Sequence, residues 1–302
     1  MSDTLAIRPV TVRFARVRAA AYADLAKPRV SSLVLAATAV GYGLALPSGA
    51  GASALAGLLH TLVGTALVAA GANALNQLIE AEHDAKMERT RDRPLPSGRL
   101  GALEVLAFGM LAGVIGVAYL ALIVNPISAT IAAVTLMTYV LVYTPLKRLT
   151  PMCVLVGAIP GALPPVIGWA GAAGSLSLAP CLLFAIVFFW QLPHFASIAW
   201  RYRDDYDSAG FPMLPVVDRD GRRTTMHVVT HTFALIAASL FPAMYGVAGT
   251  TYALGAMVIG VAFLACGVAF VVDKTAGRAR FHVIASVVYL PVLLALMVID
   301  KT

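Results

Sequence analysis

Long apolar runs separated by short polar segments dominate the pattern of this chain. A bilayer core of ~30 Å needs ~20 residues of apolar helix, and about nine runs approach that length. The runs cover residues 30–47, 54–76, 102–124, 127–145, 152–170, 178–200, 230–248, 251–272 and 281–299. The pattern therefore predicts an all-α membrane protein with about nine transmembrane helices in a bundle.

Composition supports this assignment. Hydrophobic types make up 60% of the 302 residues and charged types 12%, and the mean hydropathy is +0.84. That apolar excess is too large for one water-soluble core. We expect residues 1–29 to form a basic N-terminal arm that is retained, because no small-residue cleavage site follows a short apolar stretch. Residues 30–299 are expected to form a single transmembrane domain.

The three cysteines do not suggest a special site. Cys153, Cys181 and Cys266 all lie in apolar runs and are far apart in the sequence. No Cys-x-x-Cys pair occurs, so neither a disulfide framework nor a zinc site is expected.

Basic residues orient the helices. They precede the first run and follow the second, fourth, sixth and eighth, whereas the connections at 125–126, 171–177 and 246–251 carry no charge. The positive-inside rule therefore places every basic segment in the cytoplasm. We expect an N-terminus in the cytoplasm and, with an odd number of spans, a C-terminus in the periplasm of a bacterial inner membrane.

A first acidic cluster follows the second run. If the helix continues through it, Asn76, Glu80 and Asp84 stand at i, i+4 and i+8 and project from one face. Like charges placed in this way repel unless a cation neutralises them, and a few oxygen ligands suit Mg²⁺ that completes its shell with substrate phosphates. Basic residues that can bind phosphate oxygens follow directly. They are Lys86, Arg89, Arg91 and Arg93.

A second acidic cluster follows the sixth run and contains Asp204, Asp205 and Asp207. The two clusters define motif connections at about 77–101 and 201–227 and suggest a weak internal repeat. Ordinary solvated loop charges are the alternative explanation. A functional role is favoured because both clusters lie at membrane ends, and because Asn73 and Asn76 place amides inside an apolar run, where polar groups are costly.

Three segments resemble a known family. Residues 73–99 resemble the first acidic motif of the UbiA superfamily of membrane prenyltransferases, although Glu80 stands where Asp is more usual. Residues 86–90 and 93–95 are typical of its haem-modifying branch, as are 190–195 and 203–215, where Tyr206 replaces a third acid. Residues 143–148 match a third motif, and the resemblance extends over about 24–299.

The resemblance implies a function. The expected reaction transfers a farnesyl group from farnesyl diphosphate to the 2-vinyl group of haem b, with Mg²⁺ as cofactor and water completing a hydroxyfarnesyl chain, for haem–copper oxidase assembly. It would take place in a central cavity that opens near the cytoplasmic face. The implied catalytic residues are Asn76, Glu80, Asp84, Asp204 and Asp205, the four acids holding Mg²⁺ through the diphosphate. The implied diphosphate-binding residues are Lys86, Arg89, Arg93, Tyr143, Lys147 and Arg148.

Residues on the acceptor side are less clearly defined by the sequence. The resemblance places His194, Tyr206 and Trp190 there, with His194 contacting haem propionates, ligating iron or relaying a proton. A histidine hydrogen-bonded to a neighbouring helix is the alternative. His227 and His231 are the one histidine pair at a metal-ligand spacing, and without a third ligand we expect no metal site there.

Two other functions are compatible with parts of the pattern. A transporter would also show many spans and intramembrane polar groups, but its site would lie near the bilayer midplane rather than at membrane ends. A UbiA-type enzyme acting on an aromatic acid or a quinone precursor would share the diphosphate half of the site. Membrane lipid is an expected partner, a haem A synthase or oxidase assembly factor is a candidate partner, and no nucleic acid is expected.

Overall fold

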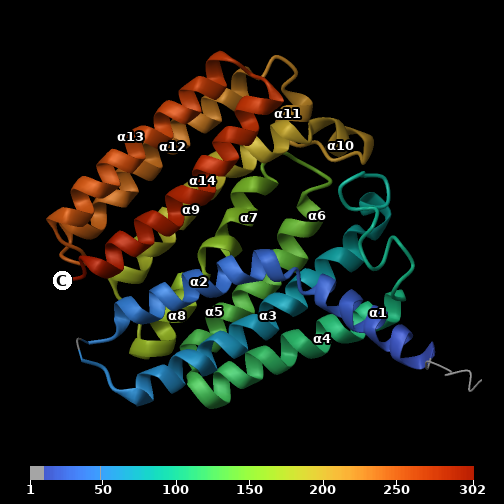
Figure 1. The fold of residues 1–302 in the computed structure, drawn as a ribbon, viewed down its shortest axis with the longest axis horizontal. Helices are drawn as coiled ribbons and strands as arrows, with labels where there is room; N and C mark the ends of the chain where they lie inside the picture. Colours follow the sequence, from blue (N-terminus) through green and yellow to red (C-terminus); the bar gives the residue numbers. More distant parts are fainter. Residues whose placement is uncertain (1–9, 48) are drawn as a thin grey trace, which may run out of the picture.

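The computed structural model describes residues 10–47 and 49–302, and this part of the chain is built from helices without β-strands (Figure 1). The first half contains α1 (Val10–Leu25), α2 (Pro28–Ala45), α3 (Ala52–Asp84), α4 (Ala102–Tyr119), α5 (Pro126–Met137), α6 (Thr144–Leu146), α7 (Cys153–Ala162) and α8 (Pro164–Ala173). The second half contains α9 (Leu178–Arg201), α10 (Arg203–Ser208), α11 (Leu214–Val217), α12 (Arg222–Met244), α13 (Thr250–Val272) and α14 (Ala276–Ile299).

Eight helical stretches in the described residues are long and apolar enough to cross a bilayer. Three combine shorter helices: α4 continues through a π-helical turn to Val124, α5 continues through another to the end of α6, and α7 is followed directly by α8. The helix α2 is not among the eight because its first residues, Pro28 and Arg29, lower its mean hydropathy. It packs along α8 and α3, so α2 together with the eight stretches approximates the predicted total of about nine helices.

The bundle packs through small residues where its helices approach most closely. A side chain at Gly71 of α3 would lie 2.6 Å from the backbone nitrogen of Gly113 in α4. On α2 and α8, Cβ atoms at Gly41 and Gly168 would each lie 1.9 Å from a backbone oxygen of the facing helix. Small residues permit such close backbone contact, which replaces the hydrophobic driving force that is absent between helices in lipid.

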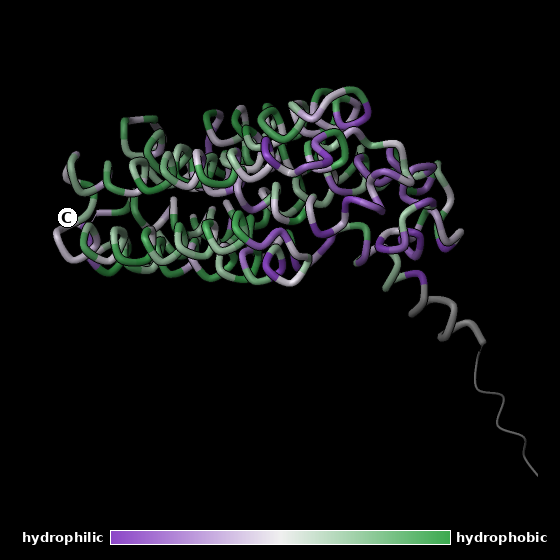
Figure 2. Tube along the Cα trace, turned by 90° about the horizontal axis from the view of Figure 1, so that it is seen from above, coloured by the Kyte–Doolittle hydropathy of each residue, from purple (hydrophilic) through white to green (hydrophobic). Residues whose placement is uncertain are grey.

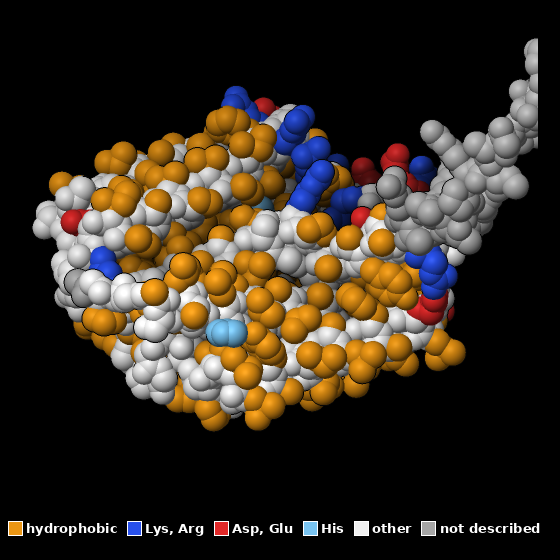
Figure 3. All heavy atoms as spheres, turned by 60° about the horizontal axis from the view of Figure 1, so that its bottom comes forward, with side chains coloured by type: hydrophobic (Ala, Val, Ile, Leu, Met, Phe, Trp, Pro, Cys, Tyr) orange, Lys and Arg blue, Asp and Glu red, His pale blue; other side chains and the backbone are white. Residues whose placement is uncertain are grey.

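Polar residues gather at one end of the bundle (Figures 2 and 3). This end, here called the motif end, contains the connection from α3 to α4 and the segment from α10 to the start of α12, and the C-terminus lies at the opposite end. Large apolar side chains are exposed along the length of the bundle, for example Leu122 at 83% and Val258 at 68%. They form the lipid-facing surface of a multi-pass membrane protein.

The helix α3 is 33 residues long and ends at Asp84. Its continuation beyond residue 76 confirms the helical arrangement considered for the first acidic cluster. The motif connections are therefore shorter than expected, 85–101 and 202–221 instead of 77–101 and 201–227, because helices continue into both. Within the N-terminal arm, α1 packs Ala21 and Leu25 against Ala74, Leu100 and Val105, whereas residues 1–9 lie outside the described part of the chain.

Candidate active site

The last turns of α3 carry the first cluster. Asn76, Glu80 and Asp84 are 3%, 1% and 0% exposed, so the i, i+4, i+8 row faces the protein rather than solvent. Carboxylates are almost never fully buried unless they are paired. The arrangement therefore requires cations beside them.

Three cations from three different segments meet this row. Lys147, just after α6, places Nζ 2.8 Å from Glu80 Oε1, and Arg93 places Nη1 2.6 Å from Asp84 Oδ2. Lys27, between α1 and α2, donates from Nζ to Asn76 Oδ1 at 3.1 Å. Asn76 in turn donates to the Thr144 hydroxyl at 3.2 Å. Three basic side chains face two carboxylates, so the cluster can offer positive charge to an anionic ligand when Lys27 is protonated.

The position of Lys27 is set by α3. Gln77 donates to the Leu25 carbonyl at 2.9 Å and Asn73 donates to the Ala26 carbonyl at 3.2 Å, which fixes the turn between α1 and α2. Lys27 itself has φ 47°, a left-handed conformation that is uncommon for a residue with a side chain. Burial of the ammonium group, reinforced by the charge of Arg93, lowers the pKa of Lys27 to about 7.

Lys27 is a site residue that the sequence interpretation missed. It counted only as one of the basic residues that orient the first span. The available signal was its place directly before Pro28, because proline disfavours the right-handed helical conformation in the preceding residue.

The carboxylates suit a divalent cation that is bound together with a substrate. Asp84 Oδ1 is buried and has no hydrogen-bond partner, so one oxygen of the row is free to act as a hard ligand. Within the described residues, no three His, Cys, Asp or Glu side chains lie close enough to hold a metal ion by themselves. A metal ion at this site would therefore take further oxygens from a bound ligand.

The second cluster approaches the first through the motif connections. Arg89 donates to the Tyr206 hydroxyl at 3.2 Å and lies over the Tyr202 and Tyr206 rings, while the backbone nitrogen of Glu88 donates to Asp205 Oδ1 at 3.4 Å. Asp204 differs from Asp205, because its side chain is 99% exposed and lies 3.6 Å from Arg203. The structure thus brings Asp205 and Tyr206 to the first connection and leaves Asp204 at the surface.

The remaining predicted diphosphate ligands are arranged in different ways. Tyr143 lies beside Lys147, whose Nζ is 5.9 Å from the Tyr143 ring centroid. Arg148 donates to the Ile79 carbonyl at the end of α3, and Lys86 is exposed. The ligand roles of all these residues stay predictions, as do those of the acids.

His194 and Trp190 form a separate group on α9. The Trp190 indole nitrogen donates to the Ser286 carbonyl at 2.7 Å, and His194 Nδ1 lies 2.5 Å from the Ser286 hydroxyl oxygen. The two rings stack with centroids 5.0 Å apart. This geometry is that of the alternative considered for His194, a histidine hydrogen-bonded to a neighbouring helix.

A small cavity adjoins the charged cluster. It has a volume of about 40 Å³ and is lined by Tyr143, Val154, Phe195, Tyr206 and Met213, among others. An apolar cluster around it includes Met87, Phe211 and Met213, which closes this side of the site toward the connections. The site therefore consists of a charged cluster at the end of α3 and, beside it, an apolar cavity between α7 and α9.

Such an arrangement defines a membrane enzyme for substrates that combine a diphosphate with a hydrocarbon chain. The sequence profile of the UbiA prenyltransferase family matches residues 34–288. The chain therefore belongs to the UbiA prenyltransferase family, and it is a prenyl-transferring enzyme rather than a transporter.

One relative by sequence and two solved structures resemble the chain over most of its length. The protoheme IX farnesyltransferase of Solibacter usitatus (strain Ellin6076) is 49% identical over 286 residues, covering 93% of this chain and 98% of that protein. A solved structure concerned with digeranylgeranylglyceryl phosphate synthase has a TM-score of 0.77 at 16% identity, covering 94% of this chain and 98% of that one. A UbiA homologue from Archaeoglobus fulgidus bound to DMAPP and Mg²⁺ has a TM-score of 0.65 at 17% identity, covering 91% and 98%. The two structures share the fold.

Proposed function

We propose that this enzyme transfers the farnesyl group of farnesyl diphosphate to the 2-vinyl group of haem b, with addition of water, to give haem O and diphosphate. The observation that carries the donor half is the convergence of Lys27, Arg93 and Lys147 on the buried row of Asn76, Glu80 and Asp84. Near full-length similarity to a protoheme IX farnesyltransferase supports haem as the acceptor. An aromatic acid or a quinone precursor is the alternative acceptor within the same family.

The chemistry begins with cleavage of the bond between the allylic C1 and the diphosphate oxygen. The electron pair of that bond moves to the diphosphate, so negative charge develops where Lys147, Arg93 and Lys27 converge. Preorganised charge at that point lowers the barrier, and no covalent enzyme intermediate is needed. The vinyl group then donates its electron pair to C1, and water adds to the resulting cation and releases a proton.

Mg²⁺ is the proposed cofactor. Glu80, Asp84 and Asp205 would hold it together with the diphosphate, and it would neutralise charge on the leaving group. Asp204 is not placed to contribute, because its side chain is 99% exposed. The unpaired Asp84 Oδ1 supports this role, and so does the presence of Mg²⁺ with DMAPP in the Archaeoglobus fulgidus homologue. Glu80 and Asp84 are paired with Lys147 and Arg93. Their cations are then available to turn toward the diphosphate when the metal binds.

The apolar cavity protects the reacting carbon. Tyr143 and Tyr206 line the cavity beside the charged cluster, and Met87 and Phe211 are almost fully buried nearby. Exclusion of bulk water at this point favours attack by the vinyl group over hydrolysis of the allylic cation. Asn76 contributes by positioning, because it links Lys27 to Thr144.

The proposed location is a bacterial inner membrane with the motif end in the cytoplasm and the C-terminus in the periplasm. Concentration of Lys and Arg at the motif end supports this orientation. Haem O is an intermediate for haem–copper oxidases, so a haem A synthase or an oxidase assembly factor is the proposed protein partner.

A direct assay tests the reaction. The purified protein in lipid nanodiscs is incubated with haem b, farnesyl diphosphate and Mg²⁺, and the haems are separated and weighed by mass spectrometry. We expect a haem that has gained a farnesyl group and a water. Asp84→Asn should lower turnover by roughly 10²–10³-fold, as loss of one electrostatic contact to a transition state commonly does.

Glu82→Gln is the matched control for Glu80→Gln, because Glu82 lies on the same helix but is exposed. Glu80→Gln should impair turnover and Glu82→Gln should not. The proposal is wrong if haem b stays unmodified while an aromatic acid or quinone precursor is prenylated under the same conditions.

A further inference from the structure

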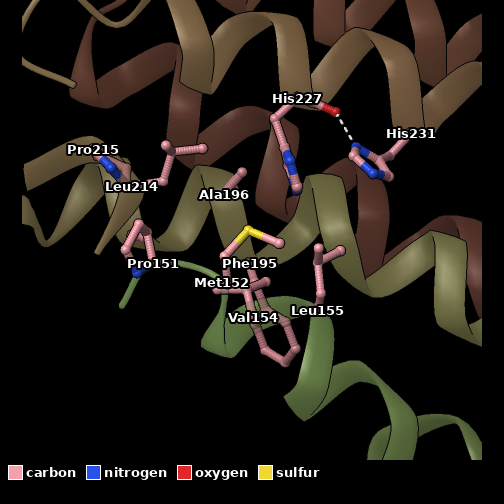
Figure 4. Close-up of a pocket in the computed structure, with 11 residues that line it drawn as sticks. Pro151, Met152, Val154, Leu155, Phe195, Ala196, Leu214, Pro215, His227 and His231 are labelled. Atoms are coloured by element: carbon pink, nitrogen blue, oxygen red, sulfur yellow. Dashed lines mark hydrogen bonds between the residues drawn. The ribbon is translucent and has the colours of Figure 1, made fainter. Parts of the chain in front are cut away.

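A second, larger cavity lies between α7, α9, α11 and α12 (Figure 4). Its volume is about 120 Å³, and apolar side chains such as Met152, Leu155 and Phe195 make up most of its lining. The exceptions are His227 and His231, which lie on one face of α12. The mechanism proposed above uses neither histidine.

The His231 imidazole is arranged as a metal-ligating histidine usually is. His231 Nδ1 lies 2.7 Å from the His227 carbonyl oxygen, shown as the dashed line in Figure 4. A carbonyl only accepts, so the neutral ring carries its proton on Nδ1 and keeps the Nε2 lone pair free. The His227 ring is 3.9 Å from that of His231, centroid to centroid, and points from α12 into the space above Met152 and Phe195. Backbone hydrogen bonds of this kind orient histidine ligands.

Positive charge precedes the pair on the same helix face. Arg223, His227 and His231 are spaced at i, i+4 and i+8 in α12, and Arg223 is exposed at the motif end. Along this face of α12, from the motif end inward, an exposed guanidinium group therefore precedes two imidazoles, and the imidazoles face the apolar wall of the cavity. The ligand that matches this order is a flat apolar macrocycle with a central metal and carboxylates on one edge.

The groove leads to the reacting centre. Its lining shares Val154, Phe195 and Ala199 with the 40 Å³ cavity, whose other wall contains Tyr143 and Tyr206. A macrocycle whose edge lies in the groove would thus point one side toward the diphosphate cluster. The cavity is smaller than the ~300–1,000 Å³ of pockets that enclose a drug-sized ligand, so it receives one edge and the remainder lies against lipid.

We propose that this groove is the docking site of the haem acceptor, that the His227–His231 pair supplies an axial nitrogen to the haem iron, and that Arg223 pairs with a propionate. The inference rests on the proposed function, which makes haem the acceptor. The porphyrin already supplies four nitrogen ligands, so one protein imidazole suffices and the absence of a third protein ligand no longer argues against iron binding. His194 is not the ligand in this arrangement, because it does not line this cavity: it belongs to the separate group in which its ring stacks on Trp190 and its Nδ1 bonds the Ser286 hydroxyl.

The test is a titration of haem into the full-length protein in nanodiscs, followed by its Soret absorption in the absence of farnesyl diphosphate. The wild-type protein should give an imidazole-ligated spectrum. His227→Gln/His231→Gln should lose that spectrum and raise the KM for haem about 10–100-fold, the usual range for loss of a metal-site contact. The KM for farnesyl diphosphate should stay unchanged, which also reports that the variant is folded.

Two further variants make the outcome specific. His60→Gln is the matched control, because His60 hydrogen-bonds Tyr119 on the α3–α4 side of the bundle and should leave the spectrum intact. Retention of imidazole ligation by the double variant, or its loss in His194→Gln instead, overturns the docking site while leaving the proposed function standing. A wild-type protein that neither binds nor farnesylates haem overturns the proposed function itself.

Discussion

The pair formed by Lys147 and Glu80 provides the sharpest test of how the charged cluster works. Lys147→Met removes the ammonium and leaves the Glu80 carboxylate buried, since the two side chains are only 12% and 2% exposed. At 2.8 Å and an effective dielectric constant of ~20, the lost attraction is about 6 kcal/mol before desolvation is subtracted. Breaking one side of a buried pair typically costs ~3–5 kcal/mol net.

A double-mutant cycle separates folding from catalysis. We expect Lys147→Met alone to lower the thermal unfolding midpoint in nanodiscs by on the order of 5–10 °C. Glu80→Gln/Lys147→Met should recover most of that loss, because no unpaired charge stays buried. Turnover should fall by roughly 10²–10³-fold in both variants, since neither has the cation that faces the leaving diphosphate.

The control for the cycle is Lys274→Met, which removes an exposed ammonium that donates only to a backbone carbonyl. It should change neither stability nor turnover appreciably. Strictly additive effects of the Glu80 and Lys147 substitutions on the midpoint would refute the buried pair. Normal turnover in Lys147→Met would refute its role toward the diphosphate even if the protein were destabilised.

Three other predictions follow from single features. Diphosphate binding should be accompanied by uptake of a proton above pH 7 and by none well below it, because the pKa of Lys27 is about 7 and a bound polyanion raises that pKa. Calorimetry in buffers of different ionisation heat measures the proton uptake, and Lys27→Arg should abolish it. Gly71→Leu should prevent α3 and α4 from packing, with lower yield and unfolding midpoint than Gly43→Leu, where a Cβ meets no neighbour within 4 Å. A reporter fused after Thr302 should be active only in the periplasm, and cytoplasmic activity would reverse the proposed orientation.

The sequence predicted the helical bundle and much of the first cluster because both depend on local periodicity. Apolar runs of membrane length and the i, i+4, i+8 spacing of Asn76, Glu80 and Asp84 follow from helix geometry alone. Which cation meets which carboxylate depends on tertiary packing. The sequence therefore could not tell which of the basic residues pairs with Glu80 and which with Asp84; the candidates were Lys86, Arg89, Arg93 and Lys147.

Features that depend on an unusual backbone conformation or on the facing helix could not be predicted from the sequence. Lys27 enters the site through a left-handed turn held by Asn73 and Gln77, and no periodic pattern encodes it. Asp204 and Asp205 are adjacent in sequence, so only their different exposure separates them. The orientation of His194 toward Ser286 depends on where α14 packs.

The length of α3 determines where the reaction meets its substrates. Its 33 residues extend ~50 Å at 1.5 Å per residue, whereas the hydrocarbon core spans ~30 Å. The end that carries Glu80 and Asp84 therefore lies at headgroup level, and a prenyl diphosphate can react without leaving the leaflet. Such an enzyme senses the mole fraction of its substrate in the lipid rather than its bulk concentration. Dilution of the bilayer with inert phospholipid should then slow the enzyme even when every aqueous concentration is held constant.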